Sequence, residues 1–203
     1  MKNDLTLITL DLEGVLVPEI WIGFAEQTGI EELKLTTRDI PDYDELMQKR
    51  LRILKDKGYK IQDIKKVIDR LSPLEGAKAF LDELRHRTQV VILSDTFTQF
   101  AGPLMEQLNL PTIFCNTLIV DEEGNITNYR LRQKDGKKIA VQNFQNMGLQ
   151  VYAAGDSFND TGMLLQAEQG FFFNPPDSCI KQFPQIPITR NYEELLVKFK
   201  EYI

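Results

Sequence analysis

The sequence predicts an α/β protein built on a mostly parallel sheet. Three short apolar runs, at residues 5–12, 90–95 and 151–156, each precede a stretch with helical spacing. Their apolar residues are continuous rather than alternating, which is typical of strands that are covered on both faces. Strands that alternate with helices favour a parallel α/β arrangement. The composition, 42% hydrophobic and 27% charged residues, is ordinary for a globular protein.

The remaining elements are predicted from their turn and capping signals. The string GFFFNP at 170–175 is a further strand, and residues 117–132 form a hairpin whose turn lies near Gly124. Residues 191–202 form a closing helix. A helix over 72–87 is expected to start at Ser72, with a capping box between that serine and the glutamate three residues later.

A helical block follows the first strand directly. Residues 17–71 hold the strings EIWIGFAEQTG, DYDELMQKRLRILKDKG and IQDIKKVIDRL, all with helical spacing. We expect this block to form a lid over the ends of the strands. The rest of the chain, residues 1–16 and 72–203, is predicted to be the core that carries the sheet.

Composition also excludes several functions. The net charge of −6 argues against binding to nucleic acid. The apolar runs are far shorter than the roughly 20 residues that a membrane span needs, and the N-terminal string MKNDLTLITL lacks the features of a signal peptide. Cys115 and Cys179 have no metal-ligand spacing, so we expect two buried thiols in a cytoplasmic protein.

Acidic residues cluster where three predicted strands end. The ends read DLEG, SDT and GDSFND, and ligands of open parallel sheets bind beyond the carboxyl ends of the strands. One such acid alone would be ordinary turn chemistry. Asp11, Glu13, Asp156 and Asp160 together would repel one another unless a cation lay among them. Since the donors are oxygens, without histidine or cysteine, the sequence predicts a Mg²⁺ site.

The second of these strand ends predicts a phosphate site. Ser94 and the amides that follow it, beginning with Asp95, are expected to head a helix near Phe97, and helix N-termini bind phosphate. Lys134, in the string RQKDGKK, either supplies a compensating positive charge or is a solvated lysine in a basic run. Carboxylates, a metal ion, a phosphate site and a lysine together indicate phosphoryl transfer.

Asp11 and Glu13 are expected to face one pocket because the chain leaves strand geometry between them. In a continuing strand, residues two apart would point to the same face with their carboxylates side by side. Gly14 allows the backbone to turn at this point.

These strings resemble the motifs of a known family. DLEGVL, ILSDT, the downstream Lys134 and GDSFND are similar to the four motifs of the haloacid dehalogenase (HAD) superfamily, and the resemblance covers nearly the whole chain. It implies a Rossmann-like parallel sheet between helices, with a small helical cap inserted after the first strand. The strings DLEGVLVPEIW, TTRDIPDYD and AAGDSFND resemble the phosphoserine phosphatase branch, in particular its members that are also homoserine phosphotransferases.

The resemblance implies roles for the acidic residues. Asp11 is the nucleophile and forms an aspartyl-phosphate. Mg²⁺ binds Asp11, the backbone carbonyl of Glu13, and Asp156, while Asp160 orients metal-bound waters or the lysine. Ser94 and Lys134 bind the phosphate.

Glu13 departs from the family pattern, which has aspartate two residues after the nucleophile. In the family this residue protonates the leaving alcohol and later deprotonates water. The longer glutamate side chain makes the geometry for activating water less favourable. We therefore hypothesise that an alcohol such as homoserine can take the phosphoryl group in place of water.

The lid carries residues expected to bind an amino acid. Arg50 lies in the middle of an apolar helical stripe, and a buried arginine needs a partner. That partner is either Asp42 or Asp44 within the lid, or a substrate carboxylate. Glu19 either binds a substrate ammonium or lies favourably near a helix N-terminus, and Asn159 either contacts substrate or shapes its turn. Arg50 and Glu19 match the positions that bind the amino acid in phosphoserine phosphatases, which implies O-phosphoserine as substrate.

Other functions remain as alternatives. A receiver-like phospho-switch has a similar acidic site but no helical lid. The dehalogenase branch needs no Mg²⁺ and no acid at position 13. A phosphatase of another small metabolite would share the whole catalytic set. The sequence is also compatible with a homodimer.

Overall fold

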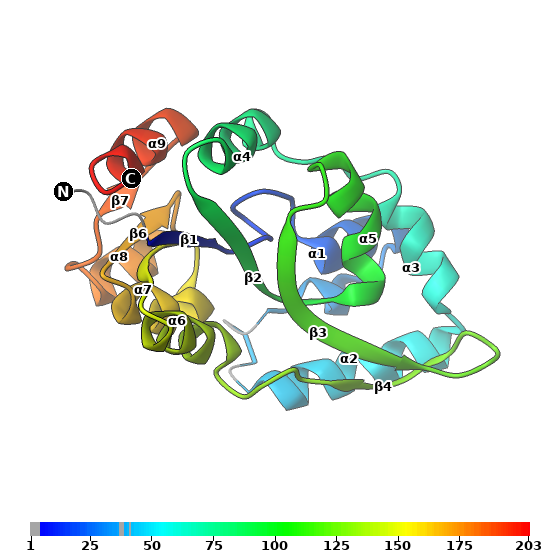
Figure 1. Ribbon diagram of the computed structural model, residues 1–203. Helices are drawn as coiled ribbons and strands as arrows, with labels where there is room; N and C mark the ends of the chain where they lie inside the picture. The colour runs from blue at the N-terminus through cyan, green and yellow to red at the C-terminus, as the bar shows by residue number, and fades with distance from the viewer. Residues whose placement is uncertain (1–4, 37–38, 41) are drawn as a thin grey trace.

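A seven-stranded sheet forms the centre of the protein, with helices on both faces (Figure 1). The computed structural model describes residues 5–36, 39–40 and 42–203; residues 37, 38 and 41 of the string TTRDIPDYD, and residues 1–4, lie outside this part. The strand order is β4-β3-β2-β1-β5-β6-β7, in which β4 runs antiparallel to β3 and the other pairs are parallel. The strands are β1 (Thr6–Leu10), β2 (Gln89–Phe97), β3 (Thr112–Val120), β4 (Ile126–Arg130), β5 (Gln150–Gly155), β6 (Gln169–Phe173) and β7 (Ile188–Thr189).

The central strand is the first one in the sequence. β1 lies between β2 and β5, and its last residue, Leu10, pairs with Ile92 on one side and Ala154 on the other. All five residues of β1 are buried, as a continuous apolar run predicts for a strand covered on both faces. The predicted α/β class and parallel sheet are therefore confirmed, and the three acidic strand ends lie on neighbouring strands.

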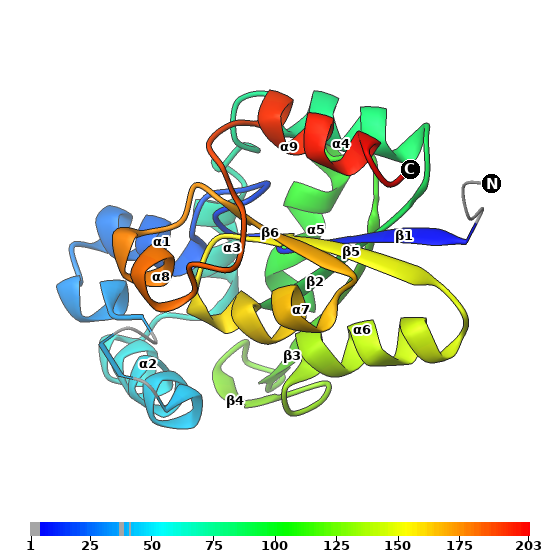
Figure 2. The same cartoon turned by 90° about the vertical axis from the view of Figure 1, so that its left-hand side faces the viewer.

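Two helical layers cover the sheet and give it two hydrophobic cores. In Figure 2, α4 and α9 lie above the sheet, and α6 and α7 lie below it. Side chains of α4, α5 and α9 belong to the larger core cluster, and those of α6, α7 and α8 to the smaller one. These helices are α4 (Ala77–Arg85), α5 (Thr98–Gln107), α6 (Gly136–Asn146), α7 (Thr161–Gln166), α8 (Asp177–Gln182) and α9 (Tyr192–Lys200).

The predicted start of α4 is wrong. The helix begins at Ala77, and no capping box forms at Ser72. Gly76 has a left-handed backbone with φ of 83° and precedes the helix, while Leu74 N donates a hydrogen bond to Leu16 O at 2.9 Å. The segment before α4 is therefore bonded to the loop after β1 instead of extending the helix.

The block after β1 is helical, as predicted. It contains α1 (Ile20–Thr28), the short 3₁₀ helix η1 (Glu31–Lys34), α2 (Tyr43–Lys57) and α3 (Ile61–Ile68). Figure 2 shows α1 and α2 beyond the carboxyl end of β1. The division of the chain into a cap of residues 17–71 and a core stays a prediction.

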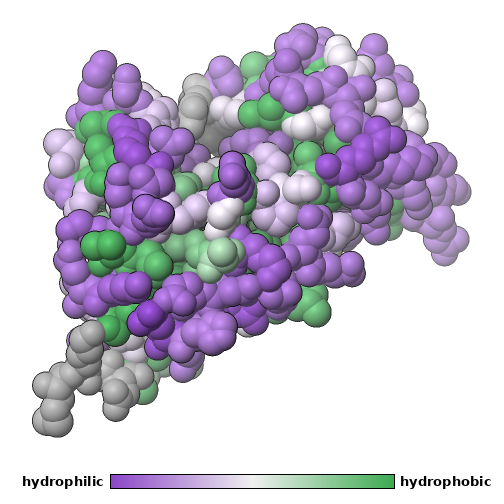
Figure 3. Space-filling view, turned by 90° about the horizontal axis from the view of Figure 1, so that it is seen from above, coloured by the Kyte–Doolittle hydropathy of each residue, from purple (hydrophilic) through white to green (hydrophobic). Residues whose placement is uncertain are grey.

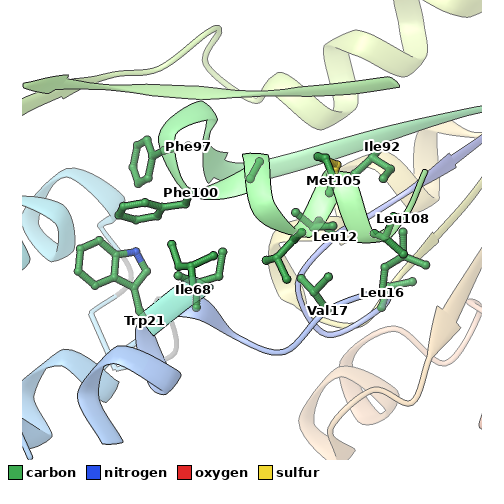
Figure 4. Packing of buried hydrophobic residues seen from close by; sticks show 14 of the residues in the cluster. Leu12, Leu16, Val17, Trp21, Ile68, Ile92, Phe97, Phe100, Met105 and Leu108 are labelled. Carbon is green, nitrogen blue, oxygen red and sulfur yellow. The ribbon is translucent and has the colours of Figure 1, made fainter. Parts of the chain in front are cut away.

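Aromatic packing joins this helical block to the sheet layer. Trp21 of α1 contacts Phe100 of α5 edge-on, with ring centroids 5.7 Å apart, and Phe100 contacts Phe97 in the same way. Figure 4 shows these rings together with Ile68 at one end of the large core. Trp21 and Phe24 are both buried, and Trp21 also lines the pocket described below.

The β3–β4 hairpin contacts the same block at two places. At its tip, Gly124 O accepts a hydrogen bond from Ile61 N at 2.9 Å, where α3 begins. On β4, the Tyr129 hydroxyl donates to Asp44 Oδ1 at 2.5 Å, and its ring meets that of Tyr43 edge-on. The hairpin therefore contacts the start of α2 and the start of α3.

The surface is mostly polar. On the face shown in Figure 3, hydrophilic residues predominate and hydrophobic ones form small separate patches. Cys115 and Cys179 are both buried, in agreement with the prediction of two buried cysteines. Among the described residues, no helix combines the length and the apolar character that crossing a bilayer requires.

Candidate active site

A pocket of about 330 Å³ opens at the carboxyl ends of β1, β2 and β5. Its walls come from these strand ends and from the helical block that follows β1. Most of the predicted site residues line it: Asp11, Glu13, Glu19, Arg50, Ser94, Asp95, Asp156 and Asn159. Asp160 lies behind this wall and is fully buried. The predicted lysine is not part of this wall.

Lys137 is the cation at the base of the pocket. Its Nζ lies 2.8 Å from Asp11 Oδ1, 2.7 Å from Asp160 Oδ1 and 3.7 Å from Asp95 Oδ2. Only 5% of the residue is exposed. Burial alone would lower the pKa of its ammonium, but the surrounding aspartates outweigh this and raise the pKa well above its usual value. Lys137 is therefore a fixed positive charge.

The structure thus corrects the assignment of Lys134. That residue is exposed and lines a neighbouring pocket, because the loop after β4 continues to Asp135 and α6 begins only at Gly136. Lys137 lies in the first turn of α6, on the same face as the buried Ala140. The i, i+3 spacing between Lys137 and Ala140 is visible in the sequence. It distinguishes Lys137 from the other basic residues of this run, because it places Lys137 on the apolar face of a helix.

Asp11 follows β1 directly and is almost completely buried. Its Oδ1 accepts a hydrogen bond from the Leu12 amide at 2.7 Å. Burial, together with the negative charges of Asp160 and Asp156, raises the pKa of Asp11 well above its usual value, although Lys137 opposes this shift. One lysine therefore does not fully compensate the negative charge here.

The residues around Asp11 fit a divalent metal ion. Carboxylate oxygens of Asp11, Asp156 and Asp160 all lie within 4.8 Å of one another. The Oδ2 of Asp160 accepts hydrogen bonds from the amides of Asp156 and Ser157, at 2.9 and 3.1 Å, and its Oδ1 is bonded to the lysine. Both oxygens of Asp160 are thus engaged with the protein, which favours Asp11 and Asp156 as direct ligands and Asp160 as the residue that positions them. An all-oxygen donor set of this charge suits Mg²⁺.

Gly14 makes the close approach of Asp156 possible. Its φ is 80°, and a Cβ at this position would overlap the Asp156 carboxylate. The Gly14 amide donates to Val17 O at 2.8 Å, which closes the turn after Glu13. The glycine therefore has the role expected from the sequence, and it also leaves room for the second acidic strand end.

Ser94 lies within β2 and not at a helix N-terminus as predicted. The strand continues to Phe97, and α5 begins at Thr98. Ser94 Oγ accepts a hydrogen bond from the Thr96 amide at 3.1 Å. Asn159 Nδ2 donates to Asp95 Oδ2 at 3.1 Å, so the SDT and GDSFND segments are joined directly at the pocket wall.

Two glutamates face the pocket from the start of the helical block. Glu13 Oε2 accepts a hydrogen bond from the Ile20 amide, at the first residue of α1, at 3.0 Å. Glu19 is exposed at the pocket rim, yet neighbouring atoms displace enough water from its carboxyl to raise its pKa. This desolvation and the adjacent Glu13 raise the pKa of Glu19 to about 7. The region attracts a positively charged group.

Arg50 lies opposite, buried in α2 with 7% of its surface exposed. Nη2 donates to Leu35 O at 2.8 Å, and the guanidinium lies over the Trp21 ring at 4.6 Å. Burial lowers its pKa to about 10. The expected alternative, a salt bridge to Asp42 or Asp44, does not form: both bond elsewhere, and no carboxylate of the described residues pairs with Arg50.

Comparison with known proteins identifies the family. A family model for haloacid dehalogenase-like hydrolases matches residues 5–168. The chain belongs to the HAD-like hydrolase family. A relative from Pseudomonas syringae named phosphoserine phosphatase is 57% identical to this hydrolase, over 94% of the chain and 80% of the relative. A relative from Pseudomonas aeruginosa named phosphoserine phosphatase ThrH is 56% identical, over 94% and 93%.

A solved structure has the same architecture as this HAD-like hydrolase. The crystal structure of a phosphoserine phosphatase in its apo form superposes with a TM-score of 0.78 and 26% identity, covering 96% of this chain and 98% of the other. The predicted membership of the HAD superfamily is therefore confirmed, and so is its fold.

Replacing Lys137 should destabilise the protein, whereas replacing Lys134 should not. Lys137→Met leaves buried aspartates without their cation, a change that costs about 3–5 kcal/mol of unfolding free energy. Lys134→Met, at an exposed position, should stay within about 0.5 kcal/mol of the wild type. Urea unfolding in EDTA measures both.

The destabilisation of Lys137→Met should also depend on pH. Without the lysine, which opposes the upward shift, the folded-state pKa of Asp11 lies further above its unfolded value, so folding favours the protonated form of Asp11. The difference in unfolding free energy between the wild type and Lys137→Met should therefore become smaller as the pH falls and larger as the pH rises. An equal loss of stability in Lys137→Met and Lys134→Met would contradict the assignment of Lys137.

Proposed function

We propose that this HAD-like hydrolase is a Mg²⁺-dependent phosphatase that hydrolyses O-phosphoserine through an aspartyl-phosphate on Asp11. The observation that carries the proposal is the arrangement of charges in one pocket. A buried carboxylate beside Lys137 forms one end, and the buried guanidinium of Arg50, without a carboxylate partner among the described residues, lies across from it. The names of the two Pseudomonas relatives support the same substrate.

Asp11 acts as the nucleophile in this proposal. A carboxylate oxygen attacks the phosphorus of the substrate, the bond between phosphorus and the serine oxygen breaks, and an acyl phosphate forms on Asp11. Lys137 stabilises the additional negative charge that develops on the transferring phosphoryl group. Ser94 donates a hydrogen bond to a phosphoryl oxygen.

Glu13 acts as the general acid and base. Its carboxyl gives a proton to the leaving serine oxygen and then takes a proton from the water that attacks the phosphorus of the aspartyl-phosphate. This second step releases inorganic phosphate and restores the Asp11 carboxylate. Asp160 takes no part in proton transfer; it fixes Lys137 and the backbone that carries Asp156.

The carboxylates of Asp11 and Asp156, with the backbone carbonyl of Glu13, would hold the metal ion. When bound, Mg²⁺ supplies positive charge that reduces the repulsion between the nucleophile and the phosphate. The raised pKa of Asp11, caused by burial and by the neighbouring carboxylates, is consistent with this requirement.

The opposite side of the pocket binds the amino acid. Arg50 binds the substrate carboxylate and Glu19 binds the substrate ammonium. Asn159 fixes Asp95, and both contact the substrate where the two strand ends meet. A zwitterionic amino acid with a phosphate ester matches this distribution of charge.

Transfer of the phosphoryl group to homoserine is a second candidate function. It is favoured by the position of the Glu13 carboxyl, which is bonded to the Ile20 amide at the start of α1. A base held by the helical block is less free to activate water. The aspartyl-phosphate then lasts long enough for an alcohol to accept the phosphoryl group.

A panel of phosphomonoesters tests the substrate and the metal together. O-phosphoserine should be turned over with the highest kcat/KM, and EDTA should abolish activity until Mg²⁺ is restored. Phosphate release and phosphohomoserine formation are measured in parallel, with and without homoserine. Activity that survives EDTA, or a preference for a phosphate ester without an amino-acid moiety, would contradict the proposal.

Arg50→Ala should impair recognition of the amino acid selectively. Loss of hydrogen bonds to a charged carboxylate should raise KM for phosphoserine by roughly tenfold or more, while KM for p-nitrophenyl phosphate changes little. Arg52→Ala, at an exposed position of the same helix, is the matched control and should behave like the wild type. Equal losses on both substrates would count against the carboxylate site.

Glu13→Asp should shift the balance toward hydrolysis. The shorter side chain cannot keep the bond to the Ile20 amide from the same backbone position, so its carboxyl becomes available to water. We expect the ratio of phosphate release to transfer to homoserine to rise several-fold, measured from both products in one reaction. An unchanged ratio would reject the idea that residue 13 controls the fate of the intermediate.

A further inference from the structure

Two residues that line the same pocket each have one buried polar atom without a partner. Within the described part of the chain, Thr96 Oγ1 and Arg50 Nε are the buried side-chain polar atoms that make no hydrogen bond. Both residues line the pocket that contains Asp11. They come from different segments, Thr96 from β2 and Arg50 from α2. Because buried polar groups in native proteins are almost always paired, two exceptions in one pocket indicate a ligand that supplies the partners.

The backbone beside Thr96 is held by hydrogen bonds, so its unpaired hydroxyl is not a sign of a loose segment. Asp95 O accepts hydrogen bonds from the Tyr43 hydroxyl at 3.2 Å and from Asn116 Nδ2 at 3.1 Å. The Thr96 amide donates to Ser94 Oγ. The side chain is β-branched, with few allowed rotamers, and only 5% of the residue is exposed. The hydroxyl is thus held at the pocket wall.

The unpaired Nε–H of the Arg50 guanidinium favours an anionic hydrogen-bond acceptor. Its Nη2 already donates to Leu35 O, and the face of its guanidinium is occupied by Trp21. Nε–H remains as a free donor beside the pocket. A carboxylate has two oxygens and can accept from Nε–H and from a hydroxyl at the same time.

We propose that Thr96 is a specificity-determining residue whose hydroxyl donates a hydrogen bond to the substrate carboxylate that Arg50 Nε also binds. The proposal rests on the proposed function, because it assigns a second donor to the carboxylate of the same amino-acid substrate. The carboxylate then joins β2 to α2. Without it, Thr96 Oγ1 and Arg50 Nε both stay unpaired, so ligands that carry a carboxylate bind more favourably than ligands that lack one.

Two variants at this position separate the hydroxyl from the shape of the side chain. Thr96→Val replaces the hydroxyl by a methyl group of similar size, and Thr96→Ser keeps the hydroxyl. Since the hydroxyl has no partner in the protein, the unliganded Thr96→Val protein should melt at or above the wild-type temperature. A melting temperature several degrees lower would mean that the hydroxyl has an internal structural partner, and would overturn the proposal.

Kinetics with two substrates then identify what the hydroxyl binds. O-phosphoserine and phosphoethanolamine share the phosphate ester and the ammonium, but only phosphoserine has a carboxylate. Thr96→Val should lower kcat/KM for phosphoserine about ten- to hundredfold, the effect of one hydrogen bond to a charged group. Its kcat/KM for phosphoethanolamine should stay close to the wild-type value. Thr96→Ser should recover most of the activity on phosphoserine.

The other kinetic outcomes show whether the role of Thr96, the proposed function or both are wrong. Equal losses on both substrates would place the hydroxyl at the phosphoryl group and overturn the proposal. A wild type that prefers phosphoserine, together with a Thr96→Val variant that keeps this preference, would overturn the role of Thr96 but leave the proposed function intact. A wild type that does not prefer phosphoserine to phosphoethanolamine would overturn both.

Discussion

The buried ammonium of Lys137 between Asp11 and Asp160 is the interaction on which the site depends. Its partners come from segments distant in the sequence: the end of β1, the turn after β5, and, less closely, the end of β2. The carboxylates of Asp11 and Asp160 would be strongly destabilised at this depth without a cation. The ion pairs therefore fix the first turn of α6 against the sheet and hold the strand ends together. Catalytic geometry and local folding are consequences of the same contacts.

The pocket is built from two chemically different halves. The sheet supplies a crowded acidic end, made possible by Gly14, whose missing side chain leaves room for Asp156. The helical block supplies Arg50 and Glu19. Because the first half is shaped by the strand ends and the second by the helices that follow β1, the proposed function has the reacting group and the amino acid recognised by separate parts of the fold. Such a division lets substrate preference change without altering the nucleophile.

The sequence predicted the fold well because continuous apolar runs and acidic strand ends are local signals with one physical meaning in a parallel sheet. It failed where the exact start of a helix decided the outcome. Ser72 is predicted to cap a helix that in fact begins five residues later. Lys134 is predicted as the lysine of the site in place of Lys137, because the basic run alone does not show where α6 begins. The unpaired hydroxyl of Thr96 had no sequence signal at all, since a missing partner is a property of three-dimensional packing.

The β3–β4 hairpin that lies along α2 affects how ligands enter and leave the pocket. Tyr129 and Gly124 bond to Asp44 and Ile61, near the two ends of the segment formed by α2 and the start of α3. This segment cannot swing outward alone; it either carries the hairpin with it or gives up both bonds. If the segment and the hairpin move together, the hinges lie in the loops that connect this segment to the rest of the chain and at the base of the hairpin. A change in the hairpin tip, remote from any reacting atom, would thereby alter how fast molecules enter and leave.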